Sequence, residues 1–459
     1  MRFTPHTDAD RRAMLAAIGV SEVGDLFQDI PEEYRFPTLQ LPEPLTEMEI
    51  MRELEEMAAE NASLGHFACF LGAGAYRHFI PAVVDMVVSR NEFYTAYTPY
   101  QPEISQGTLQ ATFEYQSMVA ALTGMDVANA SHYDGATAVA EAAIMALNVH
   151  RRKRRKVVVS PTVNPMYRAV LRTYTQGMGL TIVGDEEKEN DFHALLQMCD
   201  DDTALVIVQN PDFLGELHSG QEMQDLADAV HAHGALLSVA TDPIALGLFT
   251  PPGEYGADIV TAEGQSLGNS LSFGGPYLGM FAFRGDLVRR SAGRLVGETT
   301  DAAGACGYVL TLSTREQHIR RAKATSNICT NQALNALAAA TYLAVMGKHG
   351  LRKVAELCWH KAHYAASRIA ELEGYELVNG KPFFKEFAIR CPRPVSEINR
   401  FLLEEYGIVG GYDLSQDYPY LGDAMLLCVT EMNTRAEIDD LVDALREVGQ
   451  EVIPLEVSL

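Results

Sequence analysis

Two polar positions at the ends of predicted strands could bind the charged groups of a phosphorylated cofactor. A glycine-containing turn at 135–137 separates a strand-like stretch from an alanine-rich helix. Backbone N–H groups at a helix N-terminus attract anions, and the Thr137 hydroxyl lies beside them, so this turn predicts a phosphate cradle. Asp242 follows the stretch 235–241, and in one large class of pyridoxal phosphate (PLP) enzymes such an aspartate pairs with the pyridinium nitrogen. The alternatives are an ordinary strand–helix turn and a helix cap before Pro243.

A PLP enzyme also needs a lysine that forms a Schiff base with the cofactor aldehyde. This lysine is expected at the end of the strand that follows Asp242, predicted at 257–263. Gln265 or a neighbour stands there instead, and the sequence has no lysine between Lys188 and Lys323. The sequence therefore predicts a degenerate cofactor pocket that lacks the covalent anchor, and no catalytic residue on this chain. The pocket residues are Gly135, Thr137, Asp242 and Gln265.

The elements that must position these residues alternate between strand and helix. Short apolar strands are predicted at 126–131, 156–160, 180–184, 204–210, 235–241, 257–263 and 277–284. Amphipathic helices between them imply an α/β fold with a doubly wound, mainly parallel central sheet. Ligands of such sheets gather at the carboxyl ends of the strands, where both predicted sites lie.

The two ends of the chain are predicted to form separate parts. Residues 1–65 are predicted to be an N-terminal helical arm, in which Thr46 and Glu49 form a capping box. Residues 66–330 are predicted to form the large α/β domain. Residues 331–459 are predicted to form a helical segment and a small α+β C-terminal domain.

Composition argues against several kinds of partner. The 459 residues carry a formal net charge of −25, which repels nucleic acid and anionic membrane surfaces. The basic run 151–156 is better explained as the end of a helix, where cations are favoured. No apolar stretch approaches the length of a membrane span.

Cysteine and histidine usage predicts a reduced, metal-free protein. The seven cysteines are scattered and form no C-x-x-C pair, and the N-terminus shows no export signal, so we expect a cytoplasmic location. His231 and His233 are two residues apart, and helical metal ligands need a spacing of three or four to share a face. We therefore expect both to be solvated or capping residues.

Three long segments resemble the glycine decarboxylase P-protein family. They are residues 94–124 (YTAYTPYQPEISQGTLQ…), 129–142 (NASHYDGATAVAEA) and 315–332 (REQHIRRAKATSNICTNQ). The resemblance extends from residue 70 to the C-terminus. Some members of this family contain two homologous halves, and others divide into two subunits of which only the second carries the lysine. This chain has half the length, resembles the first half and lacks the lysine, so it is similar to the alpha subunit of the two-subunit form.

The resemblance implies a PLP-dependent transferase type I (aspartate-aminotransferase-like) fold and a glycine dehydrogenase (decarboxylating) that is active only as a complex. A beta subunit, expected in an α2β2 heterotetramer, would carry the lysine and PLP, with no cofactor covalently bound to this chain. The assembled enzyme would decarboxylate glycine and pass the aminomethyl group to the lipoyl group of the H-protein. The alpha subunit would complete the cleft across the interface.

Six residues in the resembling segments are candidates for lining the interface or the cleft: Tyr97, Tyr100, Gln101, Glu103, Arg315 and His318. The tyrosines offer aromatic walls with a polar tip, and the amide and acid could hydrogen-bond a carboxylate or a partner backbone. Arg315 and His318 could serve the interface or a carboxylate that enters it. The alternative is that these residues only hold the subunits together. The family motif usually has glutamate where this chain has Ala322, which removes one charge.

Two other functions remain open from the sequence. An autonomous PLP-dependent amino-acid decarboxylase would use Lys323 as its Schiff base, although Lys323 is not at the expected strand end. A regulatory or scaffold subunit would keep the fold without contributing to turnover.

Overall fold

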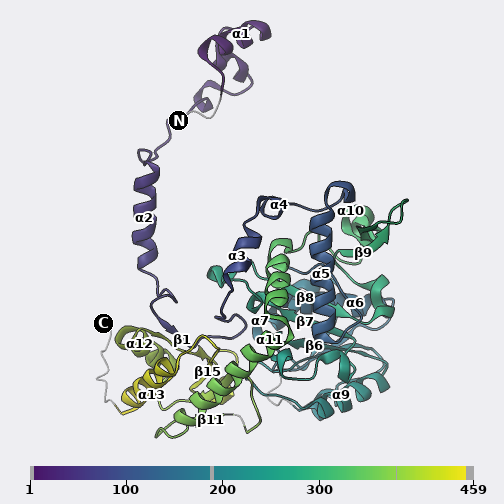
Figure 1. Cartoon of the computed structure of the whole chain (residues 1–459), viewed down its shortest axis with the longest axis vertical. Coiled ribbons are helices and arrows are strands. Elements are labelled where there is room, and N and C mark those ends of the chain that lie inside the picture. Colours follow the sequence, from purple (N-terminus) through teal and green to yellow (C-terminus); the bar gives the residue numbers. More distant parts are fainter. Residues whose placement is uncertain (1–4, 187–190, 379, 451–459) are drawn as a thin grey trace. The chain divides into compact units, whose positions relative to one another are not determined.

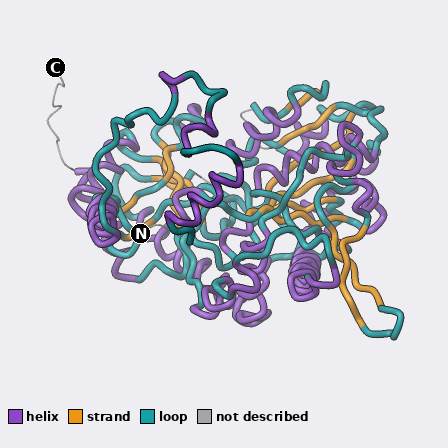
Figure 2. The backbone as a smooth tube through the Cα atoms, turned by 90° about the horizontal axis from the view of Figure 1, so that it is seen from above, coloured by secondary structure: helices purple, strands orange, loops and turns teal. Residues whose placement is uncertain are grey.

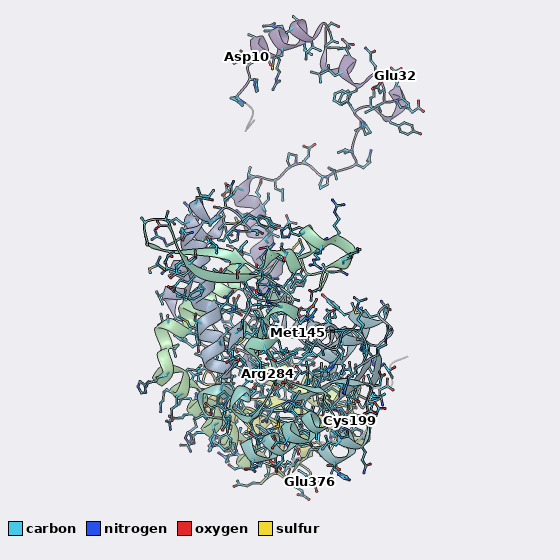
Figure 3. The ribbon with its side chains drawn as sticks, turned by 90° about the vertical axis from the view of Figure 1, so that its right-hand side faces the viewer. Asp10, Glu32, Met145, Cys199, Arg284 and Glu376 are labelled. Carbon is cyan, nitrogen blue, oxygen red and sulfur yellow. The ribbon has the colours of Figure 1, made fainter. Side chains whose placement is uncertain are left out.

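The computed structural model describes residues 5–186, 191–378 and 380–450, and it divides into two compact units, Met1–Asn61 and Ala62–Leu459 (Figure 1). The first unit contains α1 (Asp8–Ile18) and α2 (Glu47–Ala59). Thr7 and Asp10 form the capping box of α1, and Thr46 and Glu49 form that of α2, as predicted for α2. Neither helix buries a residue, and none of the described side chains of this unit forms a core. Figure 3 labels Asp10 and Glu32 on this unit.

The second unit is built on a seven-stranded sheet that contains all seven predicted strands. In spatial order they are β2 (Val127–Ala128), β8 (Gly279–Phe283), β7 (Ile259–Glu263), β6 (Leu236–Thr241), β5 (Thr203–Gln209), β3 (Lys156–Val159) and β4 (Thr181–Val183). The strands from β7 to β4 run parallel, and β8 is antiparallel to both of its neighbours. The prediction of a mainly parallel α/β sheet is confirmed.

Helices cover both faces of this sheet because its strands alternate apolar side chains between two cores. One core contains Val158 and Val206 and packs under α5 (Gln106–Thr123), α9 (Gly220–Ala232) and α11 (Ala333–Ile369). The other contains Val157 and Leu205 and packs under α6 (Gly135–Val149) and α7 (Pro165–Thr175). Met145 on α6 is fully buried among the side chains of this unit (Figure 3). Burial on both faces explains why the strands are continuously apolar.

A smaller antiparallel sheet lies in the C-terminal part of the second unit, which is not divided further. Its strands, in spatial order, are β11 (Glu376–Leu377), β12 (Glu386–Arg390), β15 (Ala424–Cys428) and β14 (Tyr412–Asp413). The helices α12 (Val395–Tyr406) and α13 (Arg435–Gln450) pack against this part through its own apolar core. The strand β1 (Ala68–Cys69) pairs in parallel with β13 (Ile408–Val409), which brings the segment that follows β1 beside the small sheet.

The remaining elements connect or flank these layers. The short helices are α3 (Ala82–Val88), α4 (Asn91–Tyr94), α8 (Phe192–Gln197) and α10 (Gln317–Arg320). A hairpin of β9 (Leu295–Thr300) and β10 (Cys306–Thr311) projects from the body (Figure 2). The side chain of Gln106, at the start of α5, binds this hairpin. Its amide nitrogen donates to Tyr308 O, and its amide oxygen accepts from Tyr308 N, at 2.9 Å each. In the described part of the chain, no helix has the length and apolar character that crossing a membrane requires.

Candidate functional site

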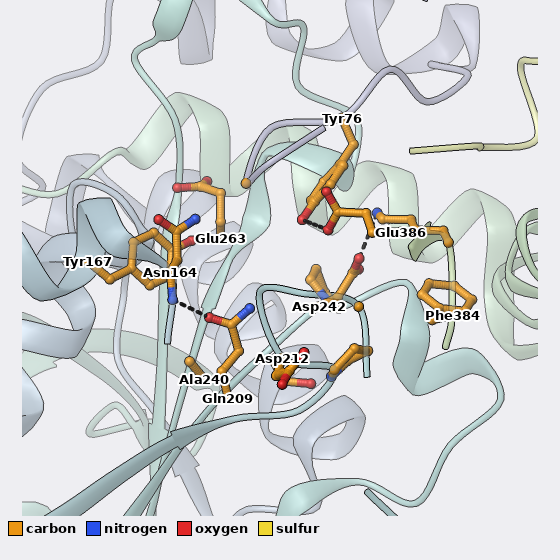
Figure 4. A pocket seen from close by; sticks show the side chains of 16 residues that line it. Tyr76, Asn164, Tyr167, Gln209, Asp212, Ala240, Asp242, Glu263, Phe384 and Glu386 are labelled. Carbon is orange, nitrogen blue, oxygen red and sulfur yellow. Dashed lines mark hydrogen bonds and ion pairs between the residues drawn. The ribbon is translucent and has the colours of Figure 1, made fainter. Parts of the chain in front are cut away.

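A polar cavity lies where the carboxyl ends of β5, β6 and β7 meet the small sheet (Figure 4). Asp242 follows β6, and Glu263 is the last residue of β7. Glu386, the first residue of β12, and the two residues before it, Phe384 and Lys385, also line the cavity. The volume of the cavity is about 30 Å³. That is room for about one water molecule, so its own side chains already fill most of the site.

Asp242 is paired with a lysine that the sequence analysis did not predict. The Lys385 Nζ atom lies 2.6 Å from Asp242 Oδ2, and the Lys385 side chain is 1% exposed. The same ammonium donates to His78 Nε2 at 3.0 Å and lies 3.5 Å from the centroid of the Tyr76 ring. Burial lowers the pKa of Lys385, but the Asp242 carboxylate together with Cys428 and Cys358 raises it, and the net effect is a pKa above its ordinary value. Lys385 is therefore a cation in this site at neutral pH.

The N-terminus of α6, the predicted phosphate cradle, is occupied by carboxyl groups of the chain itself. The Gly135 N–H donates to Glu263 Oε2 at 2.9 Å, and Gln265 N and Leu278 N donate to Glu263 Oε1 at 3.0 Å each. Burial raises the pKa of Glu263 to about 8, against the effect of these three hydrogen bonds. In either protonation state the carboxyl oxygens accept the N–H groups that a phosphate would otherwise use.

Thr137 forms the capping box of α6 with Asp134, and it lines a different cavity from Asp242. Its N–H donates to Asp134 Oδ1 at 2.7 Å, and its hydroxyl accepts from Asp134 N at 3.0 Å, which completes a capping box. Thr137 lines a cavity with His132 and Glu141, whereas Gly135 adjoins Tyr167 and Glu263, which line the Asp242 cavity. Thr137 and Asp242, which were predicted to lie together at the sheet edge, thus line two different cavities, and Gly135 adjoins two residues of the Asp242 cavity.

Gln265 anchors the backbone that follows β1. Its side-chain oxygen accepts from Tyr76 N at 2.8 Å, and its nitrogen donates to Tyr76 O at 3.0 Å and to Asn269 O at 2.8 Å. Gln265 is buried. The residue at the expected lysine position therefore holds Tyr76 over the cavity, where the Tyr76 hydroxyl donates to Glu386 at 2.8 Å (Figure 4).

Three potential metal ligands gather behind Lys385, but hydrogen bonds already use them. The ligand atoms of His78, Cys358 and Glu431 lie within 4.8 Å of one another. His78 Nδ1 donates to Glu431 Oε2 at 2.7 Å, and His78 Nε2 accepts from Lys385. Both ring nitrogens of His78 already have hydrogen-bond partners, and the Lys385 ammonium next to them would repel a metal cation. The cluster therefore extends the hydrogen-bonded pair of Lys385 and Asp242. His233 is the exposed C-cap residue of α9, as predicted, and His231 is partly exposed in the last turn but also contacts the buried Asp258 carboxylate through its Nε2 at 2.9 Å.

Two of the six predicted interface or cleft residues come together in a second polar cluster. The rings of Tyr100 and His318 contact edge to face at 5.4 Å. Arg294 lies over the Tyr100 ring at 5.7 Å, and its Nε lies 3.7 Å from Glu316 Oε2. Its Nη1 donates to Asn331 Oδ1 at 3.2 Å, and its Nη2 donates to Cys329 O at 2.6 Å and to the Tyr100 hydroxyl at 3.4 Å. Sequence reasoning missed Arg294 because nothing in its local pattern distinguishes it from the other arginines.

The other predicted residues of this set have different surroundings. Tyr97 is 79% exposed, and Gln101 and Glu103 are exposed. Arg315 points inward and donates to the Ser291 hydroxyl at 2.8 Å and to Gly293 O at 3.1 Å, so it holds a loop. None of the six lines the Asp242 cavity. Lys323, the alternative Schiff base, is exposed on a short turn and does not line it either.

The site residues do not fit PLP. Asp242, the predicted ring-nitrogen partner, is paired with Lys385, and the Gly135 N–H of the predicted phosphate cradle donates to Glu263. PLP needs a pocket on the scale of small-molecule sites, roughly 300 Å³ or more, far above the space present. Two local signals pointed to these residues. Lys385 interrupts the apolar stretch Phe383–Ile389, and an acidic residue ends β7.

Comparison with solved structures establishes the fold. A sphingosine-1-phosphate lyase from Burkholderia pseudomallei superposes with a TM-score of 0.64 at 15% sequence identity over 90% of this chain and 93% of that chain. A NifS-like protein superposes with a TM-score of 0.61 at 12% identity over 83% of this chain and 99% of that chain. These distant matches show that the chain has the PLP-dependent transferase type I fold.

Nearer relatives establish the family. A glycine decarboxylase (P-protein) of the glycine cleavage system, solved in inhibitor-bound form, has a TM-score of 0.88 at 43% identity and covers 98% of this chain and 100% of its own. The probable glycine dehydrogenase (decarboxylating) subunit 1 of Thermomicrobium roseum is 55% identical over 97% of this chain and 99% of that protein. Its counterpart in Moorella thermoacetica is 52% identical over 98% of this chain and 100% of that protein. Residues 1–445 match the sequence profile of the glycine cleavage system P-protein, and the chain belongs to this family.

Proposed function

We propose that this chain is the lysine-free subunit of a two-subunit glycine dehydrogenase (decarboxylating). With a lysine-bearing partner subunit it decarboxylates glycine and transfers the aminomethyl group to the lipoyl group of H-protein. The relatives named as subunit 1 support this proposal, because they match over nearly their whole length and their name implies a second subunit. We expect an α2β2 assembly in the cytoplasm, in keeping with the seven free cysteines.

One observation carries the proposal: a PLP-enzyme fold whose own cofactor position is taken by side chains. Asp242 is bonded to Lys385, and Gln265 stands at the strand end where a Schiff-base lysine is expected. PLP therefore belongs on the partner subunit, where its pyridine ring supplies the electron sink for the loss of carbon dioxide.

The contribution of this chain is binding and orientation across the interface. Tyr97, Tyr100 and Ile104 present large apolar surfaces to solvent, with Ile104 81% exposed. Such surfaces are typical of regions that become buried against a partner. The Tyr100 ring is oriented by Arg294 and His318. Arg294 is itself held by Glu316, Asn331 and Cys329, so the ring is presented to a partner in a fixed position.

The test is glycine–bicarbonate exchange, measured with this chain, with the lysine-bearing subunit, and with both together in the presence of H-protein and PLP. The proposal predicts exchange only when both chains are present. Exchange by this chain alone would identify an autonomous decarboxylase. Exchange by the partner alone at the rate of the mixture would leave this chain as a scaffold.

A further inference from the structure

We infer that Glu263 and Lys385 are built-in replacements for the two charged ends of PLP, and that they exclude the cofactor from the Asp242 cavity of this chain. The inference deepens the proposed function, on which it rests for the identification of the cavity as a former cofactor site. It states that Glu263 and Lys385 occupy the positions of the cofactor's charged groups, and it can be tested on this chain without the partner subunit.

The phosphate end is replaced by Glu263. A helix N-terminus binds a phosphate through free N–H groups and its positive dipole. At the N-terminus of α6 the Gly135 N–H is bonded to Glu263 at 2.9 Å, and the Thr137 N–H is bonded to Asp134 at 2.7 Å. A second pair of N–H groups, from Gln265 and Leu278, fixes the other Glu263 oxygen at 3.0 Å. A phosphate could enter only if the Glu263 side chain left.

The pyridinium end is replaced by Lys385. An aspartate that binds the cofactor ring offers its carboxylate to one N–H⁺ group. Asp242 offers Oδ2 to the Lys385 ammonium at 2.6 Å, and its Oδ1 caps the following turn through Ile244 N at 2.8 Å. Separating the two buried charges without replacement would leave each unpaired at a large cost. A PLP ring that is neutral or binds weakly therefore cannot displace Lys385 from Asp242.

The wall of the cavity is tightly packed at two glycines. A Cβ atom added at Gly135 would lie 2.5 Å from the Tyr167 hydroxyl and 3.1 Å from Glu263 Cβ. A Cβ atom added at Gly215 would lie 2.1 Å from the Glu386 carbonyl oxygen. These contacts pack the N-terminus of α6 against Tyr167 and Glu263, and the Gly215 loop against the backbone of the small sheet.

Lys385 is not itself placed as a Schiff-base lysine. The aldehyde carbon of PLP is attached to the ring carbon para to the nitrogen. An amine bonded to the ring-nitrogen partner therefore lies at the opposite end of the cofactor from the aldehyde. Lys385 directly precedes β12 of the small sheet, and Asp242 directly follows β6 of the large sheet. The pair thus joins the two sheets through a bond that needs no ligand.

The first experiment uses inorganic phosphate as a probe of the α6 N-terminus of the purified full chain. Equilibrium dialysis should show no saturable phosphate binding by the wild-type chain. Glu263→Ala removes the carboxylate and should gain saturable binding, tighter than wild type by at least about tenfold. Glu263→Gln fills the same space and serves as the matched control, which should not gain binding. A folded Glu263→Ala chain that binds phosphate no better than wild type would overturn the replacement at this end.

The second experiment tests the Lys385 end with PLP itself. The wild-type chain, incubated with PLP and reduced with borohydride, should show no phosphopyridoxyl group on Lys385 by peptide mapping. Glu263→Ala combined with Lys385→Met opens both ends and should bind PLP in dialysis at least about tenfold more tightly than wild type. Saturable PLP binding by the wild-type chain that is lost in Asp242→Asn would overturn the inference. A folded double variant that gains no binding would overturn it as well.

A thermal-unfolding cycle keeps the inference testable if the opened variants do not fold well. Asp242→Asn and Lys385→Met should each lower the melting temperature, and the double variant should lose less than the sum of the two. Additive losses would show that the two residues do not act as a pair. The exchange assay does not enter any of these readouts, so a failed replacement and a failed assignment of function remain distinguishable.

Discussion

Glu141 is a buried acid that links the stability of the chain to pH. It is almost fully buried on α6, one oxygen accepts from the Ser326 hydroxyl, and the other has no hydrogen-bond partner among the described residues. Burial raises the pKa of Glu141 from 4.5 to about 7. The folded chain therefore holds this proton more tightly than the unfolded chain. The stabilisation is complete below the ordinary pKa and is lost as pH rises through 7, with a size of roughly 3 kcal/mol.

We predict that Glu141→Gln weakens this pH dependence. The variant should have a shallower fall in the free energy of unfolding between about pH 5 and pH 8 than the wild type. Chemical denaturation at several pH values measures the slopes, with the exposed Glu404→Gln as the control that should keep the wild-type slope. Equal slopes for Glu141→Gln and wild type would show that Glu141 is already ionised in the folded chain.

Gly135 is predicted to be intolerant of a side chain. Gly135→Ala should lower the stability by about 1–3 kcal/mol, because the added carbon meets Tyr167 and Glu263 at the distances given above. Gly107 lies in the first turn of α5 with no atom within 4 Å of an added Cβ. Gly107→Ala is the matched control and should be neutral or stabilising. Denaturation of the isolated chain compares the two, and equal effects would contradict the close packing at α6.

At the residue scale the sequence predicted the position of Asp242 but not its partner. An aspartate after a buried strand is recognisable because its strand is continuous in sequence. Lys385 reaches it from the small sheet, and no local pattern specifies which residue of a distant element will meet a strand end. The same holds for Glu263, which ends a predicted strand but contacts the N-terminus of a helix from much earlier in the chain.

Among the elements, the segment between β1 and α3 is held by side chains from several distant elements, and Gln265 is the one that fixes the Tyr76 backbone. Gln265 makes three hydrogen bonds to backbone groups of Tyr76 and Asn269. We predict that Gln265→Leu lowers stability by roughly 1–3 kcal/mol for each backbone group left unpaired. Hydrogen exchange of the Tyr76 amide should accelerate more than exchange in the central strands. Unchanged exchange at Tyr76 would show that other contacts hold this segment.

The sequence predicted long buried elements better than short or exposed ones. The seven strands of the large sheet are apolar runs between amphipathic helices, so their pattern is local. The hairpin of β9 and β10 was not predicted, because its outer half is exposed and has no apolar alternation to detect. The parallel pairing of β1 with β13 joins two-residue strands from opposite ends of the second unit, and such a pairing depends on the tertiary fold.

Considered as a whole, the molecule exposes aromatic residues that an isolated chain does not need. We predict that Tyr97→Ala leaves the unfolding of the isolated chain within about 0.5 kcal/mol of wild type, because the ring is 79% exposed. Association with the lysine-bearing subunit should weaken at least about tenfold, because a truncated aromatic contact costs more than 1 kcal/mol in an interface core. Tyr420→Ala, on an exposed turn of the small domain, is the control that should bind normally.

Sedimentation of the two subunits at several concentrations measures this association. A Tyr97→Ala chain that assembles like wild type would remove residue 97 from the interface. If it assembles normally but the exchange rate falls, the residue lines the cleft instead. The sequence alone left these two roles open, because exposure and interface contacts are properties of the assembly.

The location of PLP in the assembled enzyme is the most direct test of the whole account. The complex of both subunits is loaded with PLP, reduced with borohydride and digested, and the phosphopyridoxyl peptides are identified by mass spectrometry. The account predicts the label on a lysine of the partner subunit and none on this chain. A label on Lys385 or Lys323 of this chain would contradict it.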